Sequence, residues 1–184
     1  ALRERQGVEI CRELGRSDAS LVPDPTLLLS VHDYSSIAAP CLYSQDYLLL
    51  YLLGNEIDFD VAEVYAWARS RHIEVKYVAS QGRQDAYDKI YPNVDEWLSL
   101  IRNARYVVTN SFHGLIFAAQ MHTPFSVFSR EQADTKISQL LAWLGLSNRA
   151  MVSGDEDVPL EMNFDDMESR LAGLRESSLG YLRG

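Results

Sequence analysis

The segment Tyr47–Leu53 constrains the fold more than any other part of this sequence. It reads Tyr-Leu-Leu-Leu-Tyr-Leu-Leu, so it is apolar on both faces, and Gly54 and Asn55 follow it. A strand with this pattern is buried on both sides, which is typical of a central strand in a parallel sheet covered by helices. We therefore expect a sheet with helices on each face.

Strand-like and helix-like segments alternate regularly after this strand. Helical periodicity and cap residues predict helices at 60–71, 94–103, about 113–121, 135–144 and from about 164. Short apolar runs predict strands at 75–79, 106–109, 125–128 and 150–152. This alternation predicts an α/β fold, a Rossmann-like parallel sheet flanked by helices. Ligands of such folds gather at the carboxyl ends of the strands, where helix N-termini present free N–H groups.

The first 46 residues follow a different pattern. Apolar residues at helical spacing predict a helix at 4–14, and Gly15 suits its end. Two prolines in 21–29 disfavour a helix, so we expect an extended edge or end-of-strand segment there. Residues 30–46 are rich in Ser and Ala and contain Pro40. We interpret them as a loop that serves as a linker or hinge.

Charge and composition narrow the classes of function. The chain has 17 Lys and Arg against 26 Asp and Glu, for a net charge of −9. This balance argues against nucleic-acid binding, although a local cluster of donors would still suit a small anion. Two cysteines make neither a disulfide framework nor a metal quartet, which favours a reducing, cytoplasmic location. No apolar run approaches the roughly 20 residues of a transmembrane helix, which leaves only peripheral membrane association open.

The most polar strand-to-helix turn is Thr109–Gly114, which reads Thr-Asn-Ser-Phe-His-Gly. Asn110 or Ser111 can cap the following helix, and Gly114 lets the backbone approach closely. His113 lies beside the positive end of the helix dipole, where an imidazole can accept or give a proton near neutral pH. A phosphate or carboxylate would meet free N–H groups there. The same residues also suit a plain helix cap, and the sequence leaves both interpretations open.

The segment Arg105–Gly114 resembles the signature of the polysaccharide pyruvyl transferase family. Five other segments resemble the family in order and spacing: Leu2–Glu4, Asp24–Leu29, Tyr47–Leu53, Val94–Ala104 and Thr135–Leu146. The resemblance spans most of the chain, but only the carboxy-terminal half of a family member.

The resemblance implies the C-terminal domain of a two-domain, glycosyltransferase-B-like fold, with the active site between the two halves. Residues 1–30 would then be a remnant of the N-terminal domain, 31–46 the linker, and 47–184 the C-terminal Rossmann-like domain. The chain opens with Ala1, and its first methionine is Met121. We therefore expect a piece of a longer protein, with the N-terminal domain as its missing partner.

The implied reaction moves pyruvate from phosphoenolpyruvate onto a sugar or oligosaccharide as a cyclic ketal, in exopolysaccharide or cell-envelope glycan biosynthesis. Each step moves a proton, so a general acid–base group is useful, and His113 is the candidate. The donor is strongly anionic and needs cationic partners. The resemblance puts anion-binding residues at Arg3 and Lys136. No cofactor is expected beyond phosphoenolpyruvate as the donor substrate.

The turn departs from the family pattern at one point. Some members have Arg and Leu before the histidine, where this chain has Ser111 and Phe112. No guanidinium is therefore present in the turn. Either Arg130 or Lys136 compensates, or the donor is held differently, or the donor is not phosphoenolpyruvate. The candidate substrate-binding residues are Arg3, Asn110, Ser111, Phe112, Gly114, Arg130 and Lys136.

Three other interpretations compete with this one. Asp58-Phe59-Asp60 copies the metal-binding Asp-x-Asp of other glycosyltransferases, but it sits where a helix cap belongs, so we expect no metal site. Half of a nucleotide-sugar-dependent glycosyltransferase would bind a nucleotide diphosphate. A non-catalytic saccharide-binding module would keep the fold without the chemistry, and Ser111 and Phe112 are its best support.

Overall fold

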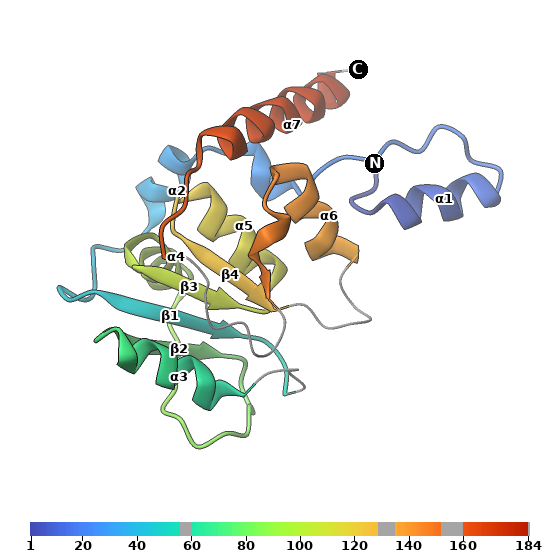
Figure 1. Cartoon of the computed structure of the whole chain (residues 1–184). Coiled ribbons are helices and arrows are strands. Elements are labelled where there is room, and N and C mark those ends of the chain that lie inside the picture. Colours follow the sequence, from blue (N-terminus) through green and yellow to red (C-terminus); the bar gives the residue numbers. More distant parts are fainter. Residues whose placement is uncertain (56–59, 129–134, 152–159, 184) are drawn as a thin grey trace.

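The computed structural model describes residues 1–55, 60–128, 135–151 and 160–183 (Figure 1). Within these ranges, five strands form one all-parallel sheet in the order β2-β1-β3-β4-β5. The strands are β1 (Tyr47–Leu52), β2 (Glu74–Ala79), β3 (Tyr106–Thr109), β4 (Phe125–Phe128) and β5 (Ala150–Met151). The predicted Rossmann-like parallel sheet is confirmed. Strand β1, which is apolar on both faces, lies between β2 and β3.

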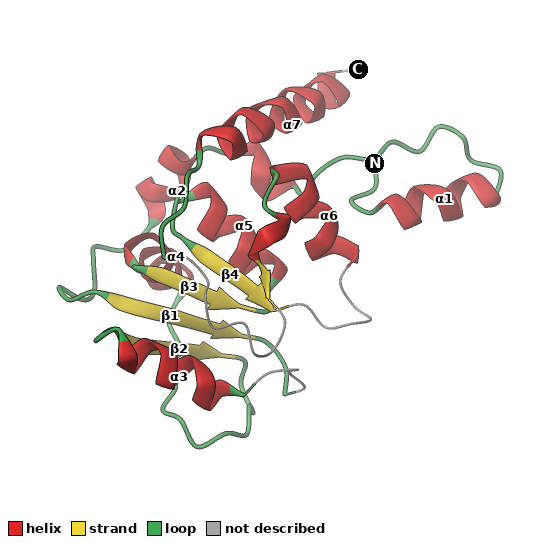
Figure 2. Cartoon of the chain, viewed as in Figure 1, coloured by secondary structure: helices red, strands yellow, loops and turns green. Residues whose placement is uncertain are grey.

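Helices cover both faces of this sheet (Figure 2). The α-helices are α1 (Arg5–Glu13), α2 (Val31–Ile37), α3 (Val61–Ser70), α4 (Val94–Asn103), α5 (Phe112–Gln120), α6 (Thr135–Leu144) and α7 (Asp165–Arg183). Two 3₁₀ helices accompany them, η1 (Pro25–Leu28) and η2 (Ser147–Arg149). The helices predicted at 4–14, 60–71, 94–103, 113–121, 135–144 and from 164 are all present within a residue or so of their expected bounds.

The side chains of β1 explain why its sequence is apolar throughout. Leu48 and Leu50 belong to a buried cluster that includes Val64 of α3. Leu49 points to the opposite cluster, which is built from α4, α5, α6 and α7. Successive residues of a strand face opposite sides of a sheet, so both faces of β1 are buried beneath helices.

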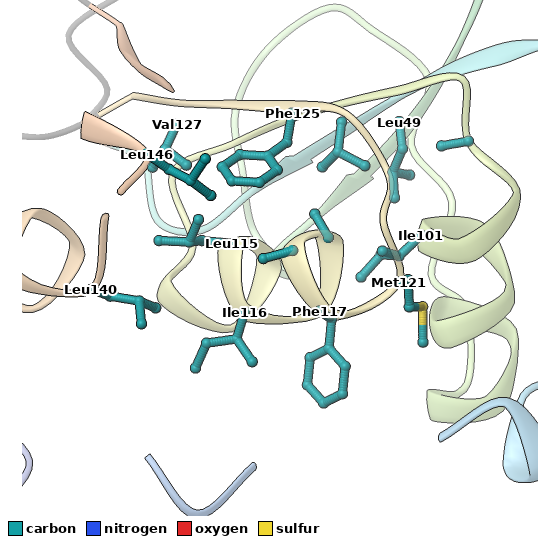
Figure 3. Packing of buried hydrophobic residues seen from close by; sticks show 14 of the residues in the cluster. Leu49, Ile101, Leu115, Ile116, Phe117, Met121, Phe125, Val127, Leu140 and Leu146 are labelled. Carbon is teal, nitrogen blue, oxygen red and sulfur yellow. The ribbon is translucent and has the colours of Figure 1, made fainter. Parts of the chain in front are cut away.

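Helix α5 is the centre of the larger cluster (Figure 3). Every residue from Gly114 to Gln120 is buried. Leu115 and Ile116 are fully enclosed, and Phe125 of β4 and Leu140 of α6 belong to the same cluster. A helix that is packed on all sides has little freedom to shift, so the turn at its N-terminus is held in a fixed place at the carboxyl end of β3.

Two predictions for the first 46 residues are wrong. The segment 21–29 is not a strand: Leu21 makes an isolated bridge with Leu2, and η1 follows. Proline is well suited to the first position of a helix, where Pro25 lies, because that position needs no N–H donor. Asp24 caps η1 by accepting a hydrogen bond from the backbone N–H of Thr26.

The expected loop at 30–46 contains helix α2. Ser30 and Asp33 form a reciprocal capping box at its start, a signal that the Ser-rich composition obscured. Tyr34 anchors this helix, because its ring packs edge-on against Phe117 of α5 with centroids 4.8 Å apart. Tyr34 and Leu27 both belong to the cluster around α5. The division of the chain at 30 and 46 into remnant, linker and domain stays a prediction.

Candidate active site

The turn between β3 and α5 is held by its own side chains. Ser111 caps α5, since its hydroxyl accepts a hydrogen bond of 3.2 Å from the backbone N–H of Gly114. The Thr109 hydroxyl donates to the carbonyl of Tyr51 at 2.7 Å and accepts from the Ser111 N–H at 3.0 Å. These bonds tie the turn to the neighbouring strand β1. Burial raises the pKa of the Tyr51 phenol above its ordinary value. A hydrogen bond with Ser111 offsets part of this increase.

Asn110 does not cap the helix; it joins two strand ends. Its amide oxygen accepts from the backbone N–H of Leu53 at 2.7 Å, and its amide nitrogen donates to the Leu53 carbonyl at 2.9 Å. Asn110 therefore acts as an extra pairing position beyond the last ladder residues of β1 and β3. Asn110, Ser111 and Gly114 all hold the turn in place, and their predicted contact with substrate stays a prediction.

His113 is the most exposed residue of the turn, beside the partly buried Asn110 and Phe112. Its side chain is 51% exposed, and its Nε2 lies 3.9 Å from Oδ2 of Asp24. The Phe112 ring is partly buried against the core and meets the imidazole edge-on, with centroids 5.6 Å apart. The imidazole thus stands at the carboxyl edge of the sheet, beside the N-terminus of α5. It is neither enclosed in the apolar interior nor separated from other charged groups.

Asp24 is a buried carboxylate, with a side chain only 2% exposed. Oδ1 accepts from the backbone N–H and the hydroxyl of Thr26, at 3.0 and 2.7 Å, and Oδ2 pairs with the guanidinium of Arg3. Burial on its own raises the pKa of this carboxyl. The two hydrogen bonds from Thr26 and the ion pair with Arg3 outweigh burial and hold the pKa below its ordinary value. Asp24 is therefore an anion at neutral pH.

Of the cationic residues predicted from the sequence, Arg3 contacts Asp24, and Lys136 contacts the residue that follows Arg3. Arg3 is half exposed and shares the Oδ2 atom of Asp24 with His113. Lys136 of α6 forms a 3.0 Å ion pair with Glu4, the neighbour of Arg3. Gln139 fixes the same stretch of backbone, because it donates to the Arg3 carbonyl at 3.1 Å. Arg130 lies outside the described residues.

Asp24 lies in a segment that resembles the family, but the sequence alone does not identify it as a site residue. No periodicity or local motif connects Asp24 with His113, because their contact depends on how η1 packs beside α5. The signal available was the Asp-Pro dipeptide, which predicts a cap and gives no indication of a partner. The structure brings Arg3, Asp24 and His113 together.

The metal interpretation of Asp58-Phe59-Asp60 falls partly outside the described residues. Asp60 caps α3, with its carboxylate accepting from the backbone N–H of Ala62 at 2.8 Å. In the ranges that the structure describes, no group of three or more His, Cys, Asp and Glu side chains is placed to hold a metal ion. No helix in those ranges combines the length and the apolar composition needed to cross a bilayer.

Fold and site together define a Rossmann-like α/β protein with a histidine, a buried carboxylate and an arginine at the carboxyl edge of its sheet. The sequence model of the family described as polysaccharide pyruvyl transferase matches residues 1–132, and the chain belongs to this transferase family. The matched region contains Arg3, Asp24 and the whole turn through Gly114, while Lys136 lies beyond it. No curated protein matches the chain.

Proposed function

We propose that this chain supplies part of the active site of a pyruvyl transferase that uses phosphoenolpyruvate as donor. The acceptor is a sugar or oligosaccharide of an exopolysaccharide or cell-envelope glycan, and the product carries pyruvate as a cyclic ketal. One observation carries the proposal: His113, half exposed at the carboxyl edge of the sheet, faces the carboxylate that also holds Arg3. An acid–base group beside a cation suits an anionic donor.

The reaction needs two proton movements that a single acid–base group can serve. Protonation of the methylene carbon of phosphoenolpyruvate leaves an oxocarbenium-like carbon, which the first sugar hydroxyl attacks. The carbon–oxygen bond to phosphate then breaks, and the second hydroxyl closes the ring on the same carbon. Of the two hydroxyl protons, one ends on the new methyl group and the other on the released phosphate. In this scheme His113 gives and takes these protons.

The donor carries a phosphate and a carboxylate, so its binding needs positive charge. In this proposal Arg3 supplies the guanidinium that the Ser111-Phe112 pair does not provide. A guanidinium has five N–H donors, so Arg3 can keep its bond to Asp24 and still contact a substrate oxygen. Lys136, which pairs with the neighbouring Glu4, adds a second cation, with Arg130 as a further candidate. In this proposal, the N-terminal domain that the family resemblance implies supplies the other wall of the site.

Replacing His113 with Ala tests the role of the imidazole. In the full-length protein, phosphate release from phosphoenolpyruvate with a panel of saccharide acceptors should fall by roughly 10²–10⁴-fold. The melting temperature should stay close to that of the wild type, because the side chain is half exposed. His32→Ala is the matched control, since it removes an exposed imidazole from α2 and should leave turnover unchanged.

Three results would contradict the proposal. Unaltered turnover in His113→Ala would retire the acid–base role. A thermal shift with a nucleotide diphosphate and none with phosphoenolpyruvate would favour the glycosyltransferase interpretation. Saccharide binding by the wild type, without phosphate release under any condition, would favour a non-catalytic module.

A further inference from the structure

The two oxygens of the Asp24 carboxylate have separate partners. Oδ1 is fixed by the backbone N–H and the hydroxyl of Thr26, both within one short turn. Oδ2 faces outward to Arg3 and to Nε2 of His113, which lies 3.9 Å away. A carboxylate oxygen has two lone-pair sites and can accept from two donors at once. Asp24 therefore presents one oxygen to both candidate site residues.

The backbone that carries Asp24 is anchored to the same helix that carries His113. The carbonyl of Thr26 accepts from the Tyr34 hydroxyl at 2.8 Å and from the amide of Gln120 at 3.1 Å. Gln120 is the last residue of α5 and His113 lies in its first turn. The carboxylate and the imidazole are thus both held by helix α5, which fixes their positions relative to each other.

We propose that Asp24 is a positioning residue for His113, through the contact of its Oδ2 atom with Nε2. It keeps the proton of the neutral ring on Nε2, so that the lone pair of Nδ1 is free to take a proton from a sugar hydroxyl. Its second contact holds the Arg3 guanidinium beside the same ring. A carboxylate oxygen that faces one ring nitrogen favours the proton on that nitrogen, because it attracts the N–H and repels a lone pair. At 3.9 Å this preference already acts in the free protein. This inference rests on the proposed function of His113.

Asp24→Asn tests this role with little change in shape. The Thr26 N–H needs an acceptor, so the Asn oxygen takes the Oδ1 place and its NH₂ group faces Nε2 of His113. A donor facing Nε2 favours an unprotonated nitrogen there. The proton of the neutral ring should therefore move to Nδ1, and the Nε2–H tautomer should change from the major form to the minor one. Catalytic turnover should fall about 10–100-fold.

The measurement is a long-range ¹H–¹⁵N correlation spectrum of chain labelled at histidine, at about pH 9, where imidazoles are neutral. The His113 signals are assigned by their loss in His113→Ala. Asp46→Asn is the matched control, because it also removes a carboxylate from an arginine, the exposed partner Arg105, and should leave the His113 spectrum unchanged.

Equal tautomer fractions in wild type and a folded Asp24→Asn would overturn the proposal. The wild-type spectrum also tests it without any variant: the Nε2–H fraction should be larger for His113 than for the exposed His32, and Nδ1–H as the major form would refute it. Neither readout needs turnover. The spectra therefore report whether Asp24 positions the ring. The activity of His113→Ala reports separately whether His113 acts in catalysis.

Discussion

At the scale of single residues, the turn before α5 depends on close approach. A Cβ atom at Gly114 would lie 2.6 Å from the hydroxyl oxygen of Thr109 and 2.9 Å from Cδ1 of Tyr51. The Thr109 hydroxyl is already bonded to the Tyr51 carbonyl and the Ser111 N–H, and the Tyr51 ring packs edge-on against Trp97, so neither group can move freely. This position therefore has no room for a Cβ atom and requires glycine. The higher helix propensity of alanine does not offset the steric clash.

Gly114→Ala should accordingly destabilise the chain by about 1–3 kcal/mol, the usual cost of forcing an extra carbon into a packed site. The measurement is the free energy of unfolding from urea denaturation. Gly173→Ala is the control: a Cβ there meets nothing within 4 Å, in the exposed middle of α7. That variant should gain about 0.5–1 kcal/mol from helix propensity. Equal effects at the two glycines would contradict the steric explanation.

Some features of the candidate site could be predicted from the sequence, and others could not. The cap at Ser111 and the close approach at Gly114 follow from residues within one turn, and the sequence identified both. Asn110 was expected as a possible cap, yet it pairs with Leu53, because the ends of β1 and β3 lie side by side. The position of Asp24 next to His113 depends on the packing of η1 beside α5, and no local sequence pattern indicates that packing.

At the scale of elements, α7 holds the segment that carries Asp24. Arg175 donates to the carbonyls of Leu27 and Leu29, at 2.8 and 3.1 Å, and to the side-chain oxygen of Gln120 at 3.1 Å. One guanidinium thus links α7, η1 and the end of α5. This helix lies beyond the part of the chain that the family's sequence model matches, yet it supports the segment that carries the candidate site residue Asp24.

Arg175→Met should remove these three hydrogen bonds while keeping much of the apolar stem. We expect a loss of about 1–3 kcal/mol in the free energy of unfolding, because partly buried acceptors lose a charged donor. Backbone amides of 24–29 should also exchange faster with deuterium. Arg170→Met, which breaks an exposed pair with Asp166 on the same helix, should cost about 0.5 kcal/mol or less. Unchanged exchange at 24–29 in Arg175→Met would show that α7 does not hold this segment.

At the scale of the whole molecule, buried and paired carboxylates link stability to pH. The pKa of Asp24 lies below its ordinary value of 3.8 in the folded chain, so folding favours the ionised form. The pKa of Asp85 is also lowered: burial raises it, but hydrogen bonds from Lys89, Tyr77, Arg83 and the Tyr87 backbone outweigh that effect. Stability from such groups is fully present above the ordinary pKa and is lost as the pH falls through the folded value.

The stability difference between the wild type and Asp24→Asn should therefore depend on pH. Asn cannot ionise, so the variant lacks the part of the acid sensitivity that comes from Asp24. The difference in free energy of unfolding should be largest near pH 6 and should shrink as the pH is lowered to about 3. Urea denaturation at several pH values measures it. A constant difference across this range would mean that the Asp24 charge contributes nothing to folding.

The alternation of apolar strands and amphipathic helices was sufficient to predict the parallel sheet, the helices on its two faces and the turn with His113. These features depend on the spacing of residues that are close in the chain, which hydrophobic periodicity and cap chemistry report directly. The helix at Val31–Ile37 was missed because its capping box is short and its composition resembles that of a loop. Only the tertiary structure shows that Arg3, Asp24 and His113 lie together. Contacts between distant segments depend on how whole elements pack against one another, and no local pattern encodes that packing.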